Sequence, residues 1–140
     1  MRRATLLTRR VGRFVGRRGA FLVFLALLDL VLGYGLTQPL PLGLKPRTIY
    51  GPMMDLAPIR WWAIWWVLTG LLCLVGALAD RVQTAAFVGA AVIKTAWACC
   101  YLVGWREHLP AFNRGWQSAA IFGAFAGVVL LISGWQENRR

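Results

Sequence analysis

Two ionisable residues lie inside long apolar stretches of this 140-residue chain: Asp29 in a block at 19–38 and Lys94 in a block at 84–104. Each lies about ten residues into its block, so at about 1.5 Å per helical residue both charges lie about 15 Å deep. An unpaired charge in the middle of a bilayer costs roughly 2.5–3.5 kcal/mol, whereas two opposite charges at one depth can face each other. We therefore predict an intramembrane charge pair between Asp29 and Lys94.

Ion pairing and proton exchange are the two kinds of chemistry open to this pair. The chain has fourteen arginines and two lysines, and a buried ammonium, unlike a guanidinium, can give up its proton. The sequence is consistent both with a pair that only holds the helices together and with a pair that exchanges a proton. The small residues Gly33 and Ala90 should let the two helices approach closely. Trp97 and Tyr101 share the lysine's face, where we expect them to support the pair by a cation–π contact or a phenol hydrogen bond.

Four apolar blocks must position these residues. Each is about 20 residues long, enough to cross the roughly 30 Å hydrocarbon core. A hydrophobic content of 59% and a mean hydropathy of +0.57 exclude an ordinary soluble domain. We predict an all-α integral membrane protein, with four transmembrane helices arranged as two helical hairpins in one domain at 19–138. The predicted spans are 19–38, 59–78, 84–104 and 116–135, with outer loops at 39–58 and 105–115 and an inner turn at 79–83.

The loop at 39–58 is rich in proline and in large apolar residues. Because proline interrupts regular helices and strands, we expect an irregular segment that rests on the membrane or folds over the mouth of the bundle.

Basic residues predict the orientation. Seven arginines lie in a leader at 1–18, and a basic tail end follows at 139–140. With both termini cytoplasmic, ten basic residues lie inside and five outside, as expected in a bacterial inner membrane. In the leader, Arg3, Arg10, Arg13 and Arg17 fall largely on one helical face. This pattern favours an interfacial amphipathic segment on anionic lipid, although a leader that only sets the topology fits equally well.

Seven of the eight tryptophans fall near predicted span ends or one turn deeper, as in the run WWAIWW at 61–66. We interpret them as an aromatic belt at the membrane surface, in preference to a ligand cage. The last span carries a stripe of small residues, Ala119, Gly123 and Gly127. Such a stripe packs either inside the bundle or against a second copy, so a homo-oligomer is expected.

Catalytic chemistry has little support. The other carboxylates are scattered, and no nucleophile–base pair, phosphate loop or cofactor fingerprint is present. Cys73, Cys99 and Cys100 lie in spans without further ligands nearby, so no metal site is expected. We predict no enzyme and no cofactor, and the absence of a binding module argues against nucleic acid as the partner of the arginines.

The basic leader, tryptophan-rich helix ends, short inner turn and charged tail resemble small four-span membrane proteins of actinobacteria and their phages. Some phage proteins of this size are holins, which accumulate in the inner membrane and then open lesions, so the resemblance implies a lysis role or another phage task at the host membrane. Three hypotheses remain. The chain is a self-associating, holin-like protein, a small proton-coupled transporter or channel using Asp29 and Lys94, or a non-enzymatic scaffold for an unidentified membrane partner.

Overall fold

The computed structural model describes residues 16–40 and 43–134, and within these ranges it contains helices and no strands. Four of the helices are long and apolar enough to cross a membrane, which confirms the predicted all-α fold with four such helices. Two shorter elements, α3 and η1, lie between them. The bounds are α2 Arg17–Thr37, α3 Pro46–Leu56, α4 Ile59–Leu78, α5 Asp80–Arg106, η1 Pro110–Phe112 and α6 Gly115–Ser133.

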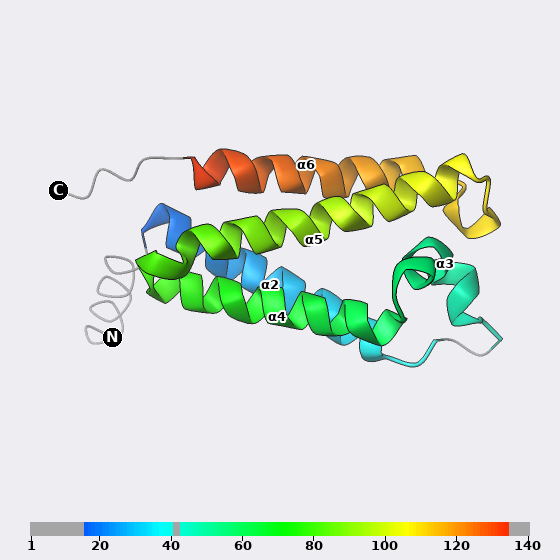
Figure 1. Cartoon of the computed structure of the whole chain (residues 1–140), viewed down its shortest axis with the longest axis horizontal. Coiled ribbons are helices and arrows are strands. Elements are labelled where there is room, and N and C mark those ends of the chain that lie inside the picture. Colours follow the sequence, from blue (N-terminus) through cyan, green and yellow to red (C-terminus); the bar gives the residue numbers. More distant parts are fainter. Residues whose placement is uncertain (1–15, 41–42, 135–140) are drawn as a thin grey trace, which may run out of the picture.

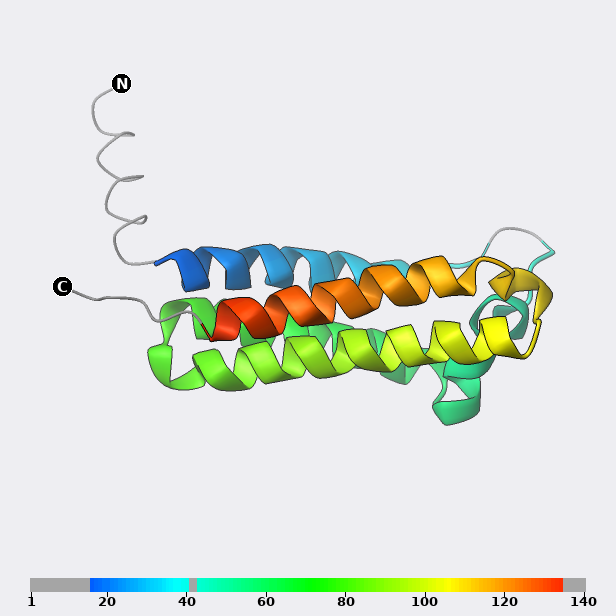
Figure 2. The same cartoon turned by 90° about the horizontal axis from the view of Figure 1, so that it is seen from above.

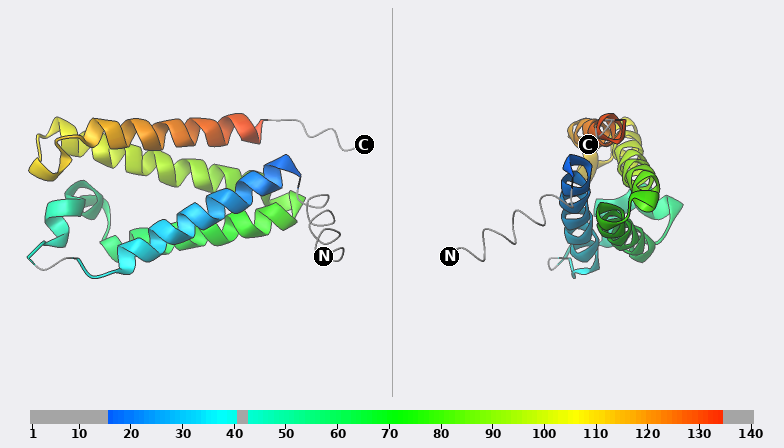
Figure 3. Two further views of the ribbon diagram at one scale, coloured as in Figure 1. Left: turned by 180° about the vertical axis from the view of Figure 1, so that it is seen from behind. Right: turned by 90° about the vertical axis from the view of Figure 1, so that its left-hand side faces the viewer.

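The long helices form an elongated bundle (Figure 1). Helix α2 packs against α4, α4 against α5, and α5 against α6, whereas α2 and α5 meet over a short stretch. The segments α3 and η1 lie at one end of the bundle, which we call the cap end. The start of α2 and the end of α6 lie at the opposite end (Figures 1 and 2). Seen end-on in Figure 3, the four helices surround a shared interior.

The connection between α4 and α5 is shorter than predicted. We expect a turn over 79–83, but only Ala79 separates the two helices. Asp80 begins α5, where an acidic residue suits the positive end of the helix dipole. Gly76 permits the close approach, because a Cβ there would lie 2.8 Å from the Cβ of Ala86. The prediction is therefore wrong for residues 80–83, which form the first turn of α5.

The proline-rich connection is not irregular throughout, because α3 occupies much of it. Pro46 lies in the first turn, where its missing N–H is not needed. Tyr50 has non-helical φ and ψ angles of −117° and 23°, so the helix is kinked just before Pro52. The kink lets Pro52 begin a new helical turn instead of interrupting one. The expectation of a wholly irregular loop is wrong, and the fully buried Met53 indicates a segment folded over the bundle.

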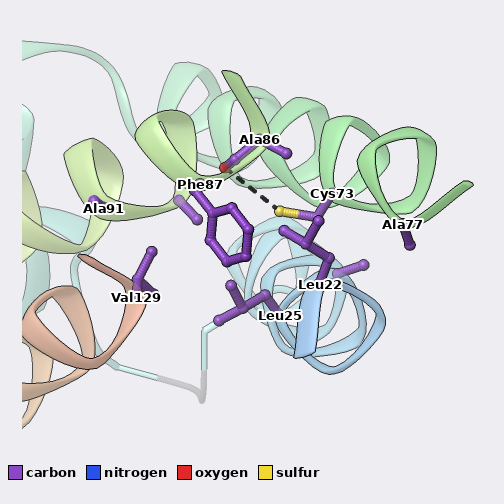
Figure 4. Close-up of a cluster of buried hydrophobic side chains, with 10 residues drawn as sticks. Leu22, Leu25, Cys73, Ala77, Ala86, Phe87, Ala91 and Val129 are labelled. Carbon is purple, nitrogen blue, oxygen red and sulfur yellow. Dashed lines mark hydrogen bonds between the residues drawn. The ribbon is translucent and has the colours of Figure 1, made fainter. Parts of the chain in front are cut away.

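Two apolar clusters fill the interior. The cluster toward the opposite end includes Leu22 and Leu25 of α2, Phe87 of α5 and Val129 of α6, which converge in Figure 4. Within it, the thiol of Cys73 donates to the carbonyl oxygen of Ala86 at 3.8 Å. The cluster toward the cap end is dominated by aromatic side chains and contains Met53, Trp62, Trp66, Ile93, Trp97, Cys100 and Phe112.

Candidate functional site

Asp29 and Lys94 meet in the interior between the two apolar clusters. The Lys94 Nζ donates to Asp29 Oδ1 at 2.6 Å, and the two side chains are 1% and 0% exposed. The second carboxylate oxygen, Asp29 Oδ2, is buried and has no hydrogen-bond partner among the described residues. The pair joins α2 to α5, two helices that otherwise make few contacts. The pair therefore links α2, which otherwise packs mainly against α4, to α5, which otherwise packs mainly against α4 and α6.

The small residues around Asp29 position α2 against α4 instead of α5. A Cβ on Gly33 would lie 2.8 Å from Val67 Cγ2 and 3.1 Å from the carbonyl oxygen of Ala63. On the facing helix, a Cβ on Gly70 would lie 3.1 Å from the Ala26 carbonyl oxygen. The expectation that Gly33 brings α2 close to α5 is therefore wrong. Its missing side chain brings α2 onto α4, while the long lysine side chain spans the distance from α5.

Ala90 is one turn before Lys94 on α5 and is fully buried. It belongs to the apolar cluster toward the opposite end, together with Ala86 and Phe87. Ala90 therefore helps to pack the helix that carries the lysine.

Trp66 supplies the aromatic contact that we expect from Trp97. The Lys94 Nζ lies 5.2 Å from the centre of the Trp66 ring, a distance at which a cation–π attraction operates. The Trp66 and Trp97 rings are in edge contact, with their centroids 5.5 Å apart. Trp97 therefore contacts Trp66, and it is the Trp66 ring that contacts the Lys94 ammonium.

The aromatic-belt interpretation is wrong for two of the four tryptophans in the 61–66 run. Trp62 and Trp66 are buried, whereas Trp61 and Trp65 are exposed. A signal for this was present in the sequence, because positions 62, 66, 69 and 73 follow the spacing of one helical face and lead to a threonine and a cysteine. Such a face with polar members points inward in a membrane bundle.

An aromatic cluster fills the space between the pair and the cap end. Tyr101 stacks on Phe122 with centroids 5.8 Å apart, and Trp97 lies 6.0 Å from Tyr101. The structure gives no hydrogen bond from Tyr101 to the charge pair. The Trp62 indole N–H donates to the Met53 carbonyl oxygen at 2.8 Å, which fixes α3 over this cluster.

The arrangement limits what the pair can do chemically. Aromatic side chains lie on its cap-end side, and Leu22, Leu25 and Phe87 lie in the cluster on the other side. In this conformation the pair can hold α2 to α5 and can share a proton internally. Exchange of that proton with water requires one of the two clusters to open.

The two glycines in the small-residue stripe of α6 have open space beside them. A Cβ added at Gly123 or Gly127 would have no neighbour within 4 Å, and Gly123 is exposed. Ala119 is partly buried at the same side of the helix. Of the two alternatives left open by the sequence, packing inside the bundle is therefore wrong for both glycines.

Arg18 has a role that the sequence did not indicate. Its guanidinium donates to the Ser133 carbonyl oxygen at 2.9 Å and lies 5.3 Å from the centre of the Phe87 ring. It thereby joins the start of α2 to the negative end of the α6 dipole. Of the leader residues predicted to face lipid, Arg17 is exposed at the start of α2, whereas Arg3, Arg10 and Arg13 lie outside the described residues.

Within residues 16–40 and 43–134 there is no group of three or more histidine, cysteine or acidic side chains able to hold a metal ion. Cys73 and Cys100 are buried free thiols, and Cys99 is an exposed one. The four long apolar helices indicate a multi-pass helical membrane protein. Neither a protein-family model, nor a curated protein, nor a solved structure matches this chain.

Proposed function

We propose that this chain is a small self-associating protein of the bacterial inner membrane that acts in a holin-like manner, by accumulating in the bilayer and permeabilising it. The observation that carries this proposal is the open space beside the two glycines in the stripe of α6. Lipid provides no hydrophobic force that drives helices together, so membrane helices associate where small residues let their backbones approach. The open positions at Gly123 and Gly127 offer such a surface.

The burial of α6 supports the same proposal. In an apolar stretch of 18 residues within α6, 17% is buried inside the bundle, against 33–44% for the corresponding stretches of the other three long helices. Ala126 and Val129 are buried, whereas the positions of Gly123 and Gly127 are open and free to contact a second α6. A homo-oligomer built on this face leaves the aromatic and aliphatic clusters intact. Any lesion then forms between copies, and not through the interior of one chain.

The proposed organisation is two helical hairpins, α2–α4 and α5–α6, with both termini cytoplasmic and the cap end outside. The uneven distribution of basic residues supports this orientation. The leader is proposed to lie as an amphipathic segment on anionic lipid of the cytoplasmic leaflet.

A membrane-potential measurement tests the function. Bacteria induced to express the chain are followed with a potential-sensitive dye, beside the double variant Gly123→Leu/Gly127→Leu. Added side chains at these open positions leave the fold intact but keep two α6 backbones apart, so the variant should retain the potential that the native chain collapses. Gly35→Leu is the matched control, because Gly35 also has no neighbour within 4 Å but lies on α2.

Subunit counting separates association from permeabilisation. Photobleaching steps of the labelled chain in vesicles should exceed one for the native chain and the Gly35→Leu control, and fall to one for the double variant. An intact potential on native expression would refute holin-like action. Unchanged subunit number in the double variant would refute the α6 contact.

A second candidate function is proton-coupled transport through the Asp29–Lys94 pair. The unpartnered Asp29 Oδ2 favours it, because a buried carboxylate oxygen with no hydrogen bond is a ready acceptor for a proton. The apolar clusters on both sides weigh against a continuous path. Proton flux into vesicles that carry a pH-sensitive dye tests this candidate. It requires flux with the native chain, and no flux with the uncharged double variant Asp29→Asn/Lys94→Met.

A further inference from the structure

An apolar groove runs along the outside of the bundle between α4 and α5. Helix α4 ends and α5 begins next to Ala79, and the two helices diverge from there toward the cap end (Figure 1). The groove has a volume of about 430 Å³, within the range of small-molecule sites. Trp65, Leu68 and Leu72 line it from α4, and Gly89, Val92 and Ala96 line it from α5.

The groove is continuous with the lipid-facing surface. Its rim residues Trp65, Leu68 and Val92 are all more than half exposed, on segments apolar enough to cross a membrane. No charged side chain lines the groove, and the hydroxyl of Thr69 is satisfied by the Trp65 carbonyl oxygen at 2.9 Å. An occupant therefore meets mainly carbon atoms, which suits a hydrocarbon chain.

The length of the groove matches one leaflet. Trp62 and Leu72 both line the α4 side and are ten residues apart. At about 1.5 Å per residue this is about 15 Å, or half of the roughly 30 Å hydrocarbon core. We propose that the groove binds one acyl chain of an anionic phospholipid from the leaflet at the cap end, with its headgroup at that end of the bundle.

Charge complementarity supports the headgroup assignment. In the described part of the cap end Arg47 is paired with Asp55 at 2.8 Å, which leaves the basic residues Lys45, Arg60, Arg106 and Arg114 against the acidic Glu107. Trp65 adds an exposed indole on the rim, the side chain that favours the boundary between hydrocarbon and headgroups.

The side chains on the rim argue against a second copy in the groove. Helices associate in membranes across small residues, but Trp65, Leu68 and Leu72 would hold another backbone away. A flexible acyl chain is narrow enough to lie between them. This proposal depends on the membrane-spanning helices and not on self-association through α6.

Photo-crosslinking of the full chain tests the site. The protein is placed in phosphatidylethanolamine–phosphatidylglycerol vesicles with a trace of phosphatidylglycerol that carries a diazirine within one acyl chain, and labelled residues are mapped by mass spectrometry. Labelling should concentrate at Trp65, Leu68 and Val92, well above that of Val75 on the same helix, which is also exposed but lies outside the groove. Even labelling of all lipid-facing residues would overturn the proposal.

Two filling variants, Ala96→Phe and Gly89→Val, should each reduce groove labelling several-fold, and unchanged labelling in both would overturn the site. Leu71→Phe is the control, because Leu71 is exposed on α4 outside the groove. Circular dichroism of the helices identifies a filling variant that fails to fold, in which case the labelling of the other filling variant tests the site. Equal labelling by a phosphatidylcholine probe would overturn the anionic headgroup, and cross-links between two protein copies at Trp65 would assign the groove to a second chain instead.

Discussion

The Lys94 ammonium lies 5.2 Å from the centre of the Trp66 ring while it donates to the Asp29 carboxylate at 2.6 Å. One cation from α5 therefore contacts both α2 and α4. Both partners are fully buried, so the attraction operates away from water, where electrostatic interactions are strongest. This single side chain joins three of the four long helices.

Removing the carboxylate charge should destabilise the bundle. Asp29→Asn leaves Lys94 buried without a counter-ion, and breaking a buried pair in this way costs about 3–5 kcal/mol. The free energy of unfolding in mixed micelles measures the loss. The double variant Asp29→Asn/Lys94→Met carries no buried charge and should recover most of it. A single variant as stable as the native chain would contradict the structural importance of the pair.

The same double variant separates the two interpretations of the pair. If it folds like the native chain and still collapses the membrane potential, the pair is structural. If it folds but leaves the potential intact, the charges themselves act in permeabilisation.

Trp66 should matter more than its exposed neighbour Trp65. Trp66→Leu removes the ring beneath the ammonium and leaves a cavity. Truncation of a buried aromatic residue to alanine costs about 3–5 kcal/mol, which sets an upper limit for the larger leucine. Trp66→Phe keeps a ring and should lose less, with the cation–π part worth about 0.5–2 kcal/mol. Trp65→Leu is the control at a lipid-facing position. Thermal loss of helical circular dichroism ranks the variants, and equal midpoints for Trp66→Leu and Trp65→Leu would contradict the contact.

Gly33→Ala should separate α2 from α4. Its new Cβ would lie 2.8 Å from Val67 Cγ2 and 3.1 Å from the Val67 backbone nitrogen, so the helices must move apart, at a cost of about 1–3 kcal/mol. Gly35→Ala is a matched change on the same helix with open space around it, and should be close to neutral. The distance between spin labels on α2 and α4 should increase in the first variant only. An unchanged distance in Gly33→Ala would show that the contact yields without moving the helix.

Arg18→Gln should loosen the end of the bundle opposite the cap. The variant loses a charge-assisted hydrogen bond to the Ser133 carbonyl oxygen, an interaction worth about 1.5–3 kcal/mol when it is buried and less at this half-buried position. Amide hydrogen exchange in the last turn of α6 should become faster. Arg17→Gln is the control, because Arg17 is exposed. Equal exchange in the two variants would argue that Arg18 does not hold α6.

Features that depend on length along a helix could be predicted from the sequence. A regular rise per residue converts sequence position into depth, so the opposite charges of Asp29 and Lys94 could be set at one level without knowledge of their neighbours. Features that depend on which helices are neighbours could not. Trp66 and its neighbour Trp65 are both expected in the aromatic belt, yet Trp66 is buried and Trp65 is exposed. In the same way, Gly33 is expected to contact α5 but packs against α4.

The sequence alone therefore determined that four helices are long and apolar enough to cross a membrane, and that two buried charges share a depth. Both follow from composition and from the fixed geometry of a helix, which satisfies its backbone hydrogen bonds internally and can therefore cross hydrocarbon without help from its neighbours. The tertiary structure decided which ring meets Lys94, that α3 is kinked at Tyr50, and that Gly123 and Gly127 of α6 face open space. These features depend on contacts between segments that are distant in sequence. Such contacts are set by how each helix is rotated about its axis and by which helices lie beside it.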